Sequence, residues 1–310
     1  MENKIEFINK FRKFPDRVTI ELTNKCNLAC NCCPRKFMTT SLGFMDKEVF
    51  EKIVDECAEH LPVALVPFFR GESLLHNHFN DFIRYAKAKG LGPIQFTTNA
   101  TLLNEKMNER ILSSGIDFIS FSLDTIDKES YEKNRLGADF DTVVNNVLRF
   151  ITEKEKLNSK LQIQVSTVDH KYYSSFQQKF IEYWRNKVDF VRIYDVHSLN
   201  GKFGSTEKGN FVSKRLPCKK LFTDMVIYWN GDVAICNHDW NRMIKLGNIT
   251  SKNLYDIYNS KAYDSIRKHH ISGDLSGEAL CYDCCHWQEY YLPEKLVGKM
   301  FLAKEVKTEY

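Results

Sequence analysis

Three cysteines stand close together near the N-terminus of the sequence. Cys26, Cys30 and Cys33 lie in the spacing CxxxCxxC within the text ELTNKCNLACNCCPR. Three thiolates on one short loop can bind three irons of a cubane cluster, whereas a [4Fe–4S] cluster normally takes four cysteine ligands. One iron would keep an open coordination position, which is what a catalytic metal needs. A zinc knuckle and buried structural cysteines are the alternatives that this spacing leaves open.

Four further cysteines lie in the last third of the sequence. Cys218 is followed by twelve residues, Gly231, four residues and then Cys236, while Cys281 and Cys284 form a CxxC pair. Together they could ligate one [4Fe–4S] cluster completely, as an electron carrier or a structural element, because no iron stays open. One zinc ion is the alternative, although zinc ribbons prefer two CxxC pairs and only one is present.

The number of cysteines also bears on the compartment. Ten cysteines in 310 residues indicate metal or redox chemistry in a reducing cytosol, where disulfides are rare. The N-terminal text MENKIEFINKFRKF lacks the apolar stretch of a signal peptide, and no apolar run is long enough to cross a bilayer. The sequence therefore predicts a cytoplasmic protein without a membrane partner.

The charge of the chain gives no sign of a nucleic-acid partner. The 44 basic and 40 acidic residues nearly cancel and leave a formal charge of +4. Nucleic-acid binding would need Lys and Arg concentrated in one place. We interpret the densest basic patch as a solvated loop, which could also meet an anionic substrate. It consists of Lys214, Arg215, Lys219 and Lys220.

Short β-rich runs alternate with helical segments up to about residue 196. Strands are expected over residues 17–22, 63–69, 94–98, 117–123, 161–168 and 188–196. Apolar residues recur at helical spacing over 49–57, after Asp46 as a candidate cap, and again over 140–151. Six such units with right-handed crossovers predict an α/β domain, a partial (βα)6 TIM-like barrel over residues 1–200. Functional groups should lie at the C-terminal ends of its strands.

A second, smaller unit is expected after the barrel. Residues 197–216 are rich in Gly, Ser and Lys and mark the boundary. Beyond them, Asn230 and Gly231 predict the turn of a β-hairpin between residues 222–229 and 232–236, followed by a helix over 254–268. The hairpin would let Cys218 and Cys236 meet at one site. These elements predict a small α+β domain over residues 201–310.

The first cysteine loop, placed directly after the first strand, resembles the signature of the radical S-adenosylmethionine (SAM) superfamily. The resemblance implies that the open iron of a [4Fe–4S] cluster chelates the amino and carboxylate groups of SAM. It also implies that an electron from the cluster cleaves SAM to a 5′-deoxyadenosyl radical, which removes a hydrogen atom from the substrate. Cys32 stands where the family usually has an aromatic or apolar residue, so we expect it to pack and not to bind iron.

Later segments resemble SAM-binding stretches of the same family. The text FFRGESLL is similar to the family's GGEPLL segment, which implies that Glu72 binds the SAM amino group. Arg70 replaces the first Gly and Ser73 the Pro, so the backbone approach there is an open question. The resemblance also implies contacts with the ribose and carboxylate of SAM for Asn99, Ser122, Asp124 and Arg135. Singly, these four could instead be a turn former, a strand-face residue, a helix cap and a solvated charge.

The C-terminal cysteines resemble the SPASM and twitch extensions that follow radical SAM barrels. A full SPASM domain would carry cysteines for two auxiliary clusters, but none follows Cys285. The resemblance therefore implies the shorter twitch form, with one auxiliary [4Fe–4S] cluster. Its ligands would be Cys218, Cys236, Cys281 and Cys284. Cys285 could replace Cys284 as a ligand, or could donate a hydrogen atom.

The order of these units resembles radical SAM dehydrogenases and related oxidoreductases that act on aminocyclitols and other carbohydrates. It implies a small hydroxylated substrate that loses a hydrogen atom, an auxiliary cluster that accepts the remaining electron, and a reducing donor such as flavodoxin or ferredoxin. A polar residue near the auxiliary cluster would take the proton. His238 is the first candidate, followed by Asp239 and Asp195; a surface histidine is the plainer interpretation of His238.

Two other functions compete with this one. A peptide-modifying radical SAM maturase or epimerase would often carry an N-terminal leader-binding domain, and only 16 residues precede the first expected strand. That favours a small-molecule substrate. A non-catalytic iron–sulfur or zinc-binding protein would have no use for an open iron or for Glu72.

Overall fold

The barrel half alternates strands and helices as expected. The computed structural model describes residues 11–195, 215–284 and 286–291. The strands are β1 (Arg17–Ile20), β2 (Ala64–Val66), β3 (Gln95–Thr98), β4 (Phe118–Ser122), β5 (Gln162–Asp169) and β6 (Phe190–Asp195). The helices are α2 (Lys47–Ala58), α3 (Phe79–Ala88), α4 (Glu105–Leu112), α5 (Lys128–Asn134), α6 (Phe140–Lys156) and α7 (Gln177–Trp184). Short 3₁₀ helices occur at η1 (Pro34–Phe37), η2 (Ser73–Leu75) and η3 (Ser174–Phe176).

The C-terminal part is smaller. It contains α8 (Lys220–Thr223), the hairpin strands β7 (Asp224–Ile227) and β8 (Val233–Ala234), α9 (Leu254–Tyr258), α10 (Lys261–Ser272) and η4 (His286–Tyr290). Gly231 forms the hairpin turn with a φ of +84°, a left-handed conformation that favours glycine. The predicted hairpin is therefore present, with shorter strands. No helix within the described ranges is both long and apolar enough to cross a membrane.

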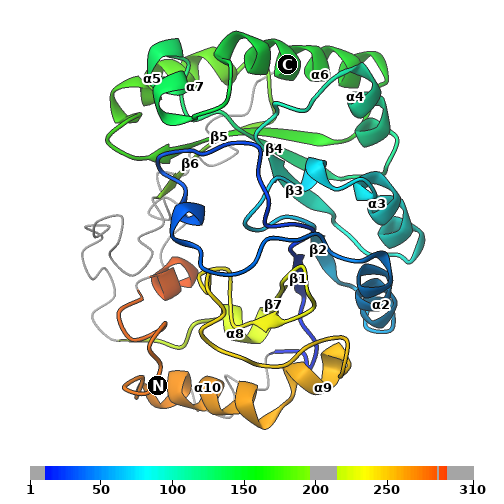
Figure 1. Cartoon of the computed structure of the whole chain (residues 1–310), viewed down its shortest axis with the longest axis vertical. Helices are drawn as coiled ribbons and strands as arrows, with labels where there is room; N and C mark the ends of the chain where they lie inside the picture. The colour runs from blue at the N-terminus through cyan, green and yellow to red at the C-terminus, as the bar shows by residue number, and fades with distance from the viewer. Residues whose placement is uncertain (1–10, 196–214, 285, 292–310) are drawn as a thin grey trace.

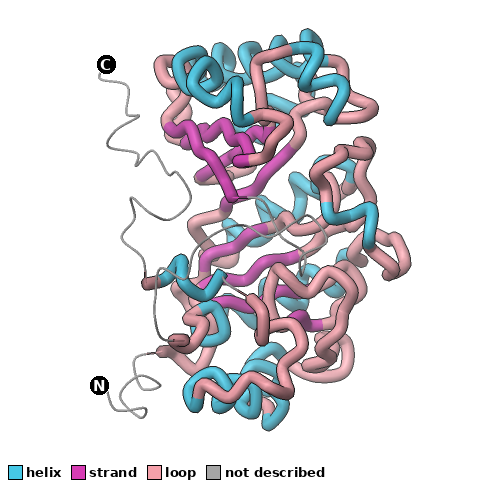
Figure 2. Tube along the Cα trace, turned by 90° about the vertical axis from the view of Figure 1, so that its left-hand side faces the viewer, coloured by secondary structure: helices cyan, strands magenta, loops and turns pink. Residues whose placement is uncertain are grey.

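The strands form two four-stranded sheets that meet at β2 and β3. Their orders are β2-β1-β7-β8 and β3-β4-β5-β6, and the pairs among β1 to β6 are all parallel. An isolated parallel bridge between Leu65 and Ile94 joins the two sheets. Figure 2 shows the strands one above another along the long axis of the molecule. The predicted α/β partial barrel is confirmed.

The helices cover the outside of this curved sheet (Figure 1). Their apolar periodicity explains the packing: in α2, Phe50, Ile53 and Val54 all turn toward the core and are fully buried. Asp46 occupies the N-cap position of α2, as predicted. Its side chain nevertheless makes no capping hydrogen bond. The side chain of Asp139 does cap α6, because it accepts from the Thr142 amide at 2.7 Å.

The helix expected over residues 254–268 is wrong as a single element. The chain forms α9 and α10 there, and Ser260 between them has an extended backbone. The Ser260 side chain accepts a hydrogen bond from the Tyr263 amide and starts a new helix. Ser and Asn compete with helical hydrogen bonds and favour caps, so the run Asn259 and Ser260 divides the apolar pattern.

The C-terminal hairpin continues the sheet of the barrel. Strand β7 pairs in parallel with β1, from Arg17 opposite Asp224 to Ile20 opposite Ile227, and pairs antiparallel with β8. The expected boundary between domains 1–200 and 201–310 lies outside the described residues and stays a prediction. The loop from β1 to α2 crosses the open side of the curved sheet, between the upper strands and the C-terminal part (Figure 1). This loop carries the first three cysteines.

Candidate functional site

The first cysteine site is a half-buried loop directly after β1. Cys26, Cys30 and Cys33 lie close enough to affect one another's ionisation, and burial is the main reason that the pKa of each thiol is raised, to about 11 for Cys33. The Cys33 amide donates to the Cys30 carbonyl at 3.1 Å and the Leu28 amide donates to the Cys26 sulfur at 3.5 Å. A thiolate in such a buried site needs a neighbouring cation. Soft sulfur donors with amide hydrogen bonds therefore fit an iron–sulfur cluster.

A glycine holds this loop against the end of β2. A Cβ added to Gly71 would lie 2.3 Å from the Thr23 carbonyl oxygen and 2.5 Å from that of Lys25, so no side chain fits. The neighbouring Glu72 amide donates to the Lys25 carbonyl at 2.9 Å. The close backbone approach that was in question at this motif is therefore kept by Gly71, although Arg70 replaces the preceding glycine.

Glu72 and Asn99 converge on the same loop. The Glu72 carboxylate is 2% exposed and accepts from the Asn99 amide at 2.8 Å and the Thr98 hydroxyl at 2.9 Å. Burial raises the pKa of Glu72 above its usual range, and the hydrogen bonds oppose that rise. The Asn99 side-chain amide donates to Asn27 at 3.0 Å and reaches the Cys26 sulfur at 3.9 Å. Two of the predicted SAM-binding residues thus meet beside Cys26.

Asp124 and Arg135 form a buried ion pair near Cys30. Arg135 Nε donates to Asp124 Oδ2 at 2.7 Å, and the two residues are 6% and 4% exposed. The structure rejects two of the local alternatives. The N-terminus of α5 is capped by Asp127 and not by Asp124, and Arg135 is not a solvated charge. Ser122 ends β4 and is half-buried. Ligand roles for these three residues stay predictions.

The sequence did not predict two tyrosines that lie next to this pair. The hydroxyls of Tyr131 and Tyr173 are buried and have no hydrogen-bond partner among the residues that the structure describes. Burial raises the pKa of Tyr131 to about 12, while the charge of Arg135 lowers this pKa and that of Asp124 raises it. Buried polar groups are normally paired, so two unpaired hydroxyls beside charges fit a bound polar cofactor. A lone tyrosine carries no motif, and no sequence signal could have found either one.

We predict that Glu72→Gln weakens SAM binding. Loss of the charged partner of the SAM amine should cost about 1.5 to 3 kcal/mol, or roughly 10- to 100-fold in Kd. Equilibrium binding of SAM to the anaerobically reconstituted protein measures this effect. Glu109→Gln, which removes an exposed carboxylate from α4, is the matched control and should bind SAM normally. Unchanged affinity in a folded Glu72→Gln protein would show that the motif is misassigned.

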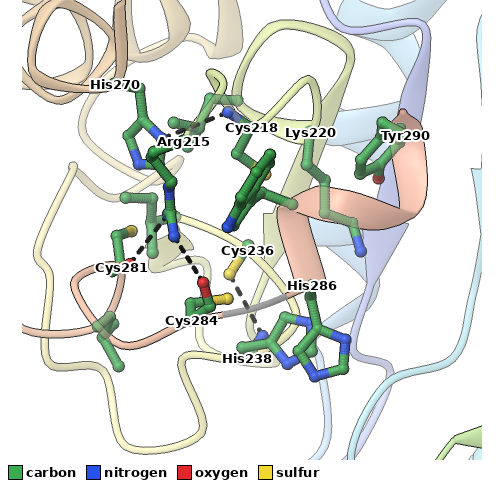
Figure 3. Close-up of a pocket in the computed structure, with 14 residues that line it drawn as sticks. Arg215, Cys218, Lys220, Cys236, His238, His270, Cys281, Cys284, His286 and Tyr290 are labelled. Atoms are coloured by element: carbon green, nitrogen blue, oxygen red, sulfur yellow. Dashed lines mark hydrogen bonds between the residues drawn. The ribbon is translucent and has the colours of Figure 1, made fainter. Parts of the chain in front are cut away.

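The second cysteine site is a cavity in the C-terminal part. Cys218, Cys236, Cys281 and Cys284 all line it and influence one another's ionisation (Figure 3). Burial raises the pKa of Cys218 to about 11 and that of Cys236 to about 12. The predicted set of four thiols is brought together, and its sulfur donors fit a fully ligated cluster. Cys285 lies outside the described residues.

Arg215 holds the CxxC loop of this cavity in place. Its guanidinium donates to the carbonyls of Cys281 at 3.0 Å and Cys284 at 2.6 Å (Figure 3). Lys220 also lines the cavity. The interpretation of this basic patch as a solvated loop is therefore wrong for Arg215 and Lys220.

Over the described ranges, no three His, Cys, Asp or Glu side chains are grouped as they would be around a single metal ion.

The predicted proton acceptors differ in their surroundings. His238 lines the cysteine cavity, and its ring stacks on that of His286 with 4.1 Å between centroids. Asp239 is fully buried, and its carboxylate accepts from the amides of Met243 at 2.8 Å and Ile244 at 3.1 Å. These contacts stabilise the loop and favour a structural role for Asp239. Asp195 ends β6, and its side chain lies outside what the structure describes.

The loops that carry the two cysteine sites touch each other. The Thr39 amide, six residues after Cys33, donates to Asn241 Oδ1 at 2.9 Å, five residues after Cys236. The Trp229 indole donates to the Ser41 carbonyl at 3.3 Å. The side chain of Arg70 donates to the Trp240 carbonyl from the barrel side. The two sites therefore belong to one connected structure.

Comparison with known proteins gives these sites their family. Residues 20–154 match the Radical SAM superfamily, and residues 218–285 match SPASM, an iron–sulfur cluster-binding domain. The chain therefore carries a radical SAM domain followed by a SPASM domain. Its radical SAM domain binds a [4Fe–4S] cluster and SAM, and its SPASM domain indicates an auxiliary iron–sulfur cluster. The predicted cofactors are confirmed; the ligand residues stay predictions.

Similar proteins that match most of the chain include one sequence relative and two solved structures. The tungsten-containing aldehyde ferredoxin oxidoreductase cofactor-modifying protein of Pyrococcus furiosus is 25% identical over 293 residues, which cover 80% of this chain and 82% of that protein. BtrN in complex with AdoMet and 2-DOIA is 18% identical with a TM-score of 0.59, covering 88% of this chain and 93% of BtrN. Streptococcus suis SuiB bound to precursor peptide SuiA is 16% identical with a TM-score of 0.67, covering 85% and 70%. At these identities the solved structures show a shared fold.

Proposed function

We propose that this radical SAM enzyme is an oxidoreductase that oxidises a hydroxylated small molecule, such as a sugar or an aminocyclitol, and passes an electron to its auxiliary cluster. The observation that carries the proposal is the cavity lined by Cys218, Cys236, Cys281 and Cys284. A cluster with four protein ligands has no open iron, so it is suited to accept an electron and not to bind a substrate. The contacts between the two cysteine loops support electron transfer between neighbouring sites.

The residues of the barrel would hold the first cluster and SAM. Cys26, Cys30 and Cys33 would ligate the cluster, Glu72 would bind the SAM amine, and Asn99 would position the loop between them. SAM would also contact Ser122, Asp124 and Arg135. When bound, these cofactors supply hydrogen-atom removal and accept an electron. The protein contributes orientation and a buried environment that excludes water.

A residue of the chain must also accept a proton. Oxidation of a secondary alcohol to a ketone removes one hydrogen atom, one proton and one electron from the substrate. His238 is the proposed proton acceptor, because it is half-buried at the cavity of the four cysteines and an imidazole can titrate near neutral pH. The electron that starts the reaction would come from a reducing donor such as flavodoxin or ferredoxin in the cytoplasm.

The substrate class is supported by one structural neighbour and contested by another. BtrN was solved with AdoMet and 2-DOIA, and its match spans nearly the whole of both chains. SuiB was solved with a precursor peptide and has the higher TM-score, 0.67 against 0.59. Peptide modification is therefore the second candidate function. The two functions differ in the product, which makes them separable by one experiment.

That experiment supplies amino sugars or cyclitols deuterated at the carbinol carbon. Oxidation predicts deuterium in 5′-deoxyadenosine and a ketone product, both measured by mass spectrometry. Cys218→Ala or Cys236→Ala should stop ketone formation while SAM cleavage persists, because the electron acceptor is lost. Cys57→Ala, which removes a buried thiol from α2, is the control and should form ketone.

Two outcomes would contradict the proposal. An epimerase would return a hydrogen to the substrate carbon without forming a ketone. A peptide that acquires an altered mass, while no carbohydrate does, would establish the maturase function instead.

A further inference from the structure

His270 is a buried histidine in the cavity of the four cysteines. It lies on α10 and is 2% exposed, and its ring lines the cavity beside Cys218 (Figure 3). No motif drew attention to this residue, because a histidine in the last turn of a helix is ordinary. Its placement next to a proposed cluster ligand gives it a possible chemical role.

The hydrogen bonding of His270 fixes the position of its ring proton. Nδ1 accepts a hydrogen bond from the Cys218 amide at 3.3 Å. A main-chain amide can only donate, so Nδ1 carries no proton and the proton of the ring lies on Nε2. Nε2 is therefore a donor.

This donor has no acceptor in the part of the chain that the structure describes. His270 Nε2 is buried and has no hydrogen-bond partner among the described residues. Buried donors are rarely left unpaired, so an unpaired one in a cavity points to a group that occupies the cavity. The two cationic side chains that line the same cavity contact protein oxygens, Arg215 at the CxxC carbonyls and Lys220 at Asn237.

We propose that His270 Nε2–H donates a hydrogen bond to a sulfur of the auxiliary cluster and thereby raises the reduction potential of that cluster. The inference rests on the proposed ligation of the cluster by the four cysteines. Reduction adds negative charge to the cluster, and a donor stabilises the more negative state more strongly. His270 thus makes the auxiliary cluster a better electron acceptor.

Two substitutions separate the donor from the rest of the ring. His270→Asn keeps an oxygen near Nδ1 for the Cys218 amide and removes the donor at Nε2. His270→Gln carries an amide donor near the position of Nε2. In the full chain with both clusters, we expect the Asn variant to shift the reduction equilibrium of the auxiliary cluster about three- to tenfold toward the oxidised form. Its midpoint potential is lowered accordingly. Tenfold corresponds to about 59 mV for a one-electron couple. The Gln variant should recover part of the shift.

The measurement is an EPR-monitored redox titration, with iron content determined on the same samples. The signal of the auxiliary cluster is the one that survives in the Cys26→Ala, Cys30→Ala, Cys33→Ala protein. Pulsed EPR of reduced wild-type protein with ¹⁵N-labelled histidine provides a test that needs no stable variant. We expect a ¹⁵N coupling to the auxiliary cluster in that protein.

Three results would overturn the proposal, and they are distinguishable. An unchanged midpoint potential in a fully loaded Asn variant would show that His270 is not a donor to the cluster. Loss of auxiliary iron from a folded Asn variant would make His270 a ligand. Zinc, or no iron, at the C-terminal site of the wild-type chain would refute the proposed cluster ligation itself.

Discussion

Replacement of Cys26, Cys30 and Cys33 together by alanine is expected to abolish SAM cleavage and to remove half of the iron. The reconstituted wild-type protein should bind about eight irons as two cubane clusters, and the variant about four. The physical reason is that, among the described residues, this loop has one further thiol, Cys32, and one thiol cannot replace three ligands. Iron and sulfide assays and the yield of 5′-deoxyadenosine measure the result.

Cys32 provides the matched control for this experiment. Its thiol is close enough to Cys30 and Cys33 for their charges to act on it, and burial raises its pKa to about 12. Because we expect Cys32 to pack and not to bind iron, Cys32→Ala should retain both clusters. Loss of iron from Cys32→Ala, or retention of eight irons by the triple variant, would contradict the assignment of ligands. Tightly bound zinc at the C-terminal site of an active protein would contradict the auxiliary cluster.

Arg70→Met is expected to lower the free energy of unfolding by about 3 to 5 kcal/mol, because it would leave a buried carboxylate without its partner. The side chains of Arg70 and Glu21 are both fully buried, and Arg70 Nη2 donates to Glu21 Oε2 at 2.7 Å. The Arg70 guanidinium also lies 4.4 Å from the centroid of the Tyr228 ring in the C-terminal part. The midpoint of urea denaturation, followed by circular dichroism, measures the loss.

A double variant tests whether the unpaired charge is the cause. Arg70→Met combined with Glu21→Gln removes both charges and should recover part of the lost stability. Lys128→Met is the control, because it breaks an exposed ion pair with Asp141 and should leave the midpoint unchanged. If Arg70→Met behaves like Lys128→Met, the buried pair does not stabilise the junction between the two parts.

The strands and the cysteine sites could be predicted because their signals are local. The six parallel strands overlap the expected runs, and the turn at Asn230 and Gly231 lies where the dipeptide places it. Four cysteines separated by up to 66 residues could be assigned to one site because thiols are few and chemically specific. The division between α9 and α10 was missed, because a cap inside an apolar pattern competes with the pattern.

The remaining features depend on contacts between distant parts of the chain. In the sequence, Arg70 is only a departure from a motif. The fold shows that it pairs with Glu21 and donates to the Trp240 carbonyl. His270 and Tyr173 have ordinary neighbours in sequence, and their unpaired polar atoms become informative only in three dimensions. Propensity and spacing describe each segment, but tertiary packing decides which side chains meet.

The parallel pairing of β7 with β1 has a consequence for synthesis of the chain. β1 leaves the ribosome about 200 residues before β7, as the pairing of Arg17 with Asp224 shows. Until then one edge of β1 has free amide and carbonyl groups that invite pairing with other strands. A fragment that ends before β7 should therefore aggregate. Chimaeras that exchange the C-terminal part between relatives must carry β1 with it.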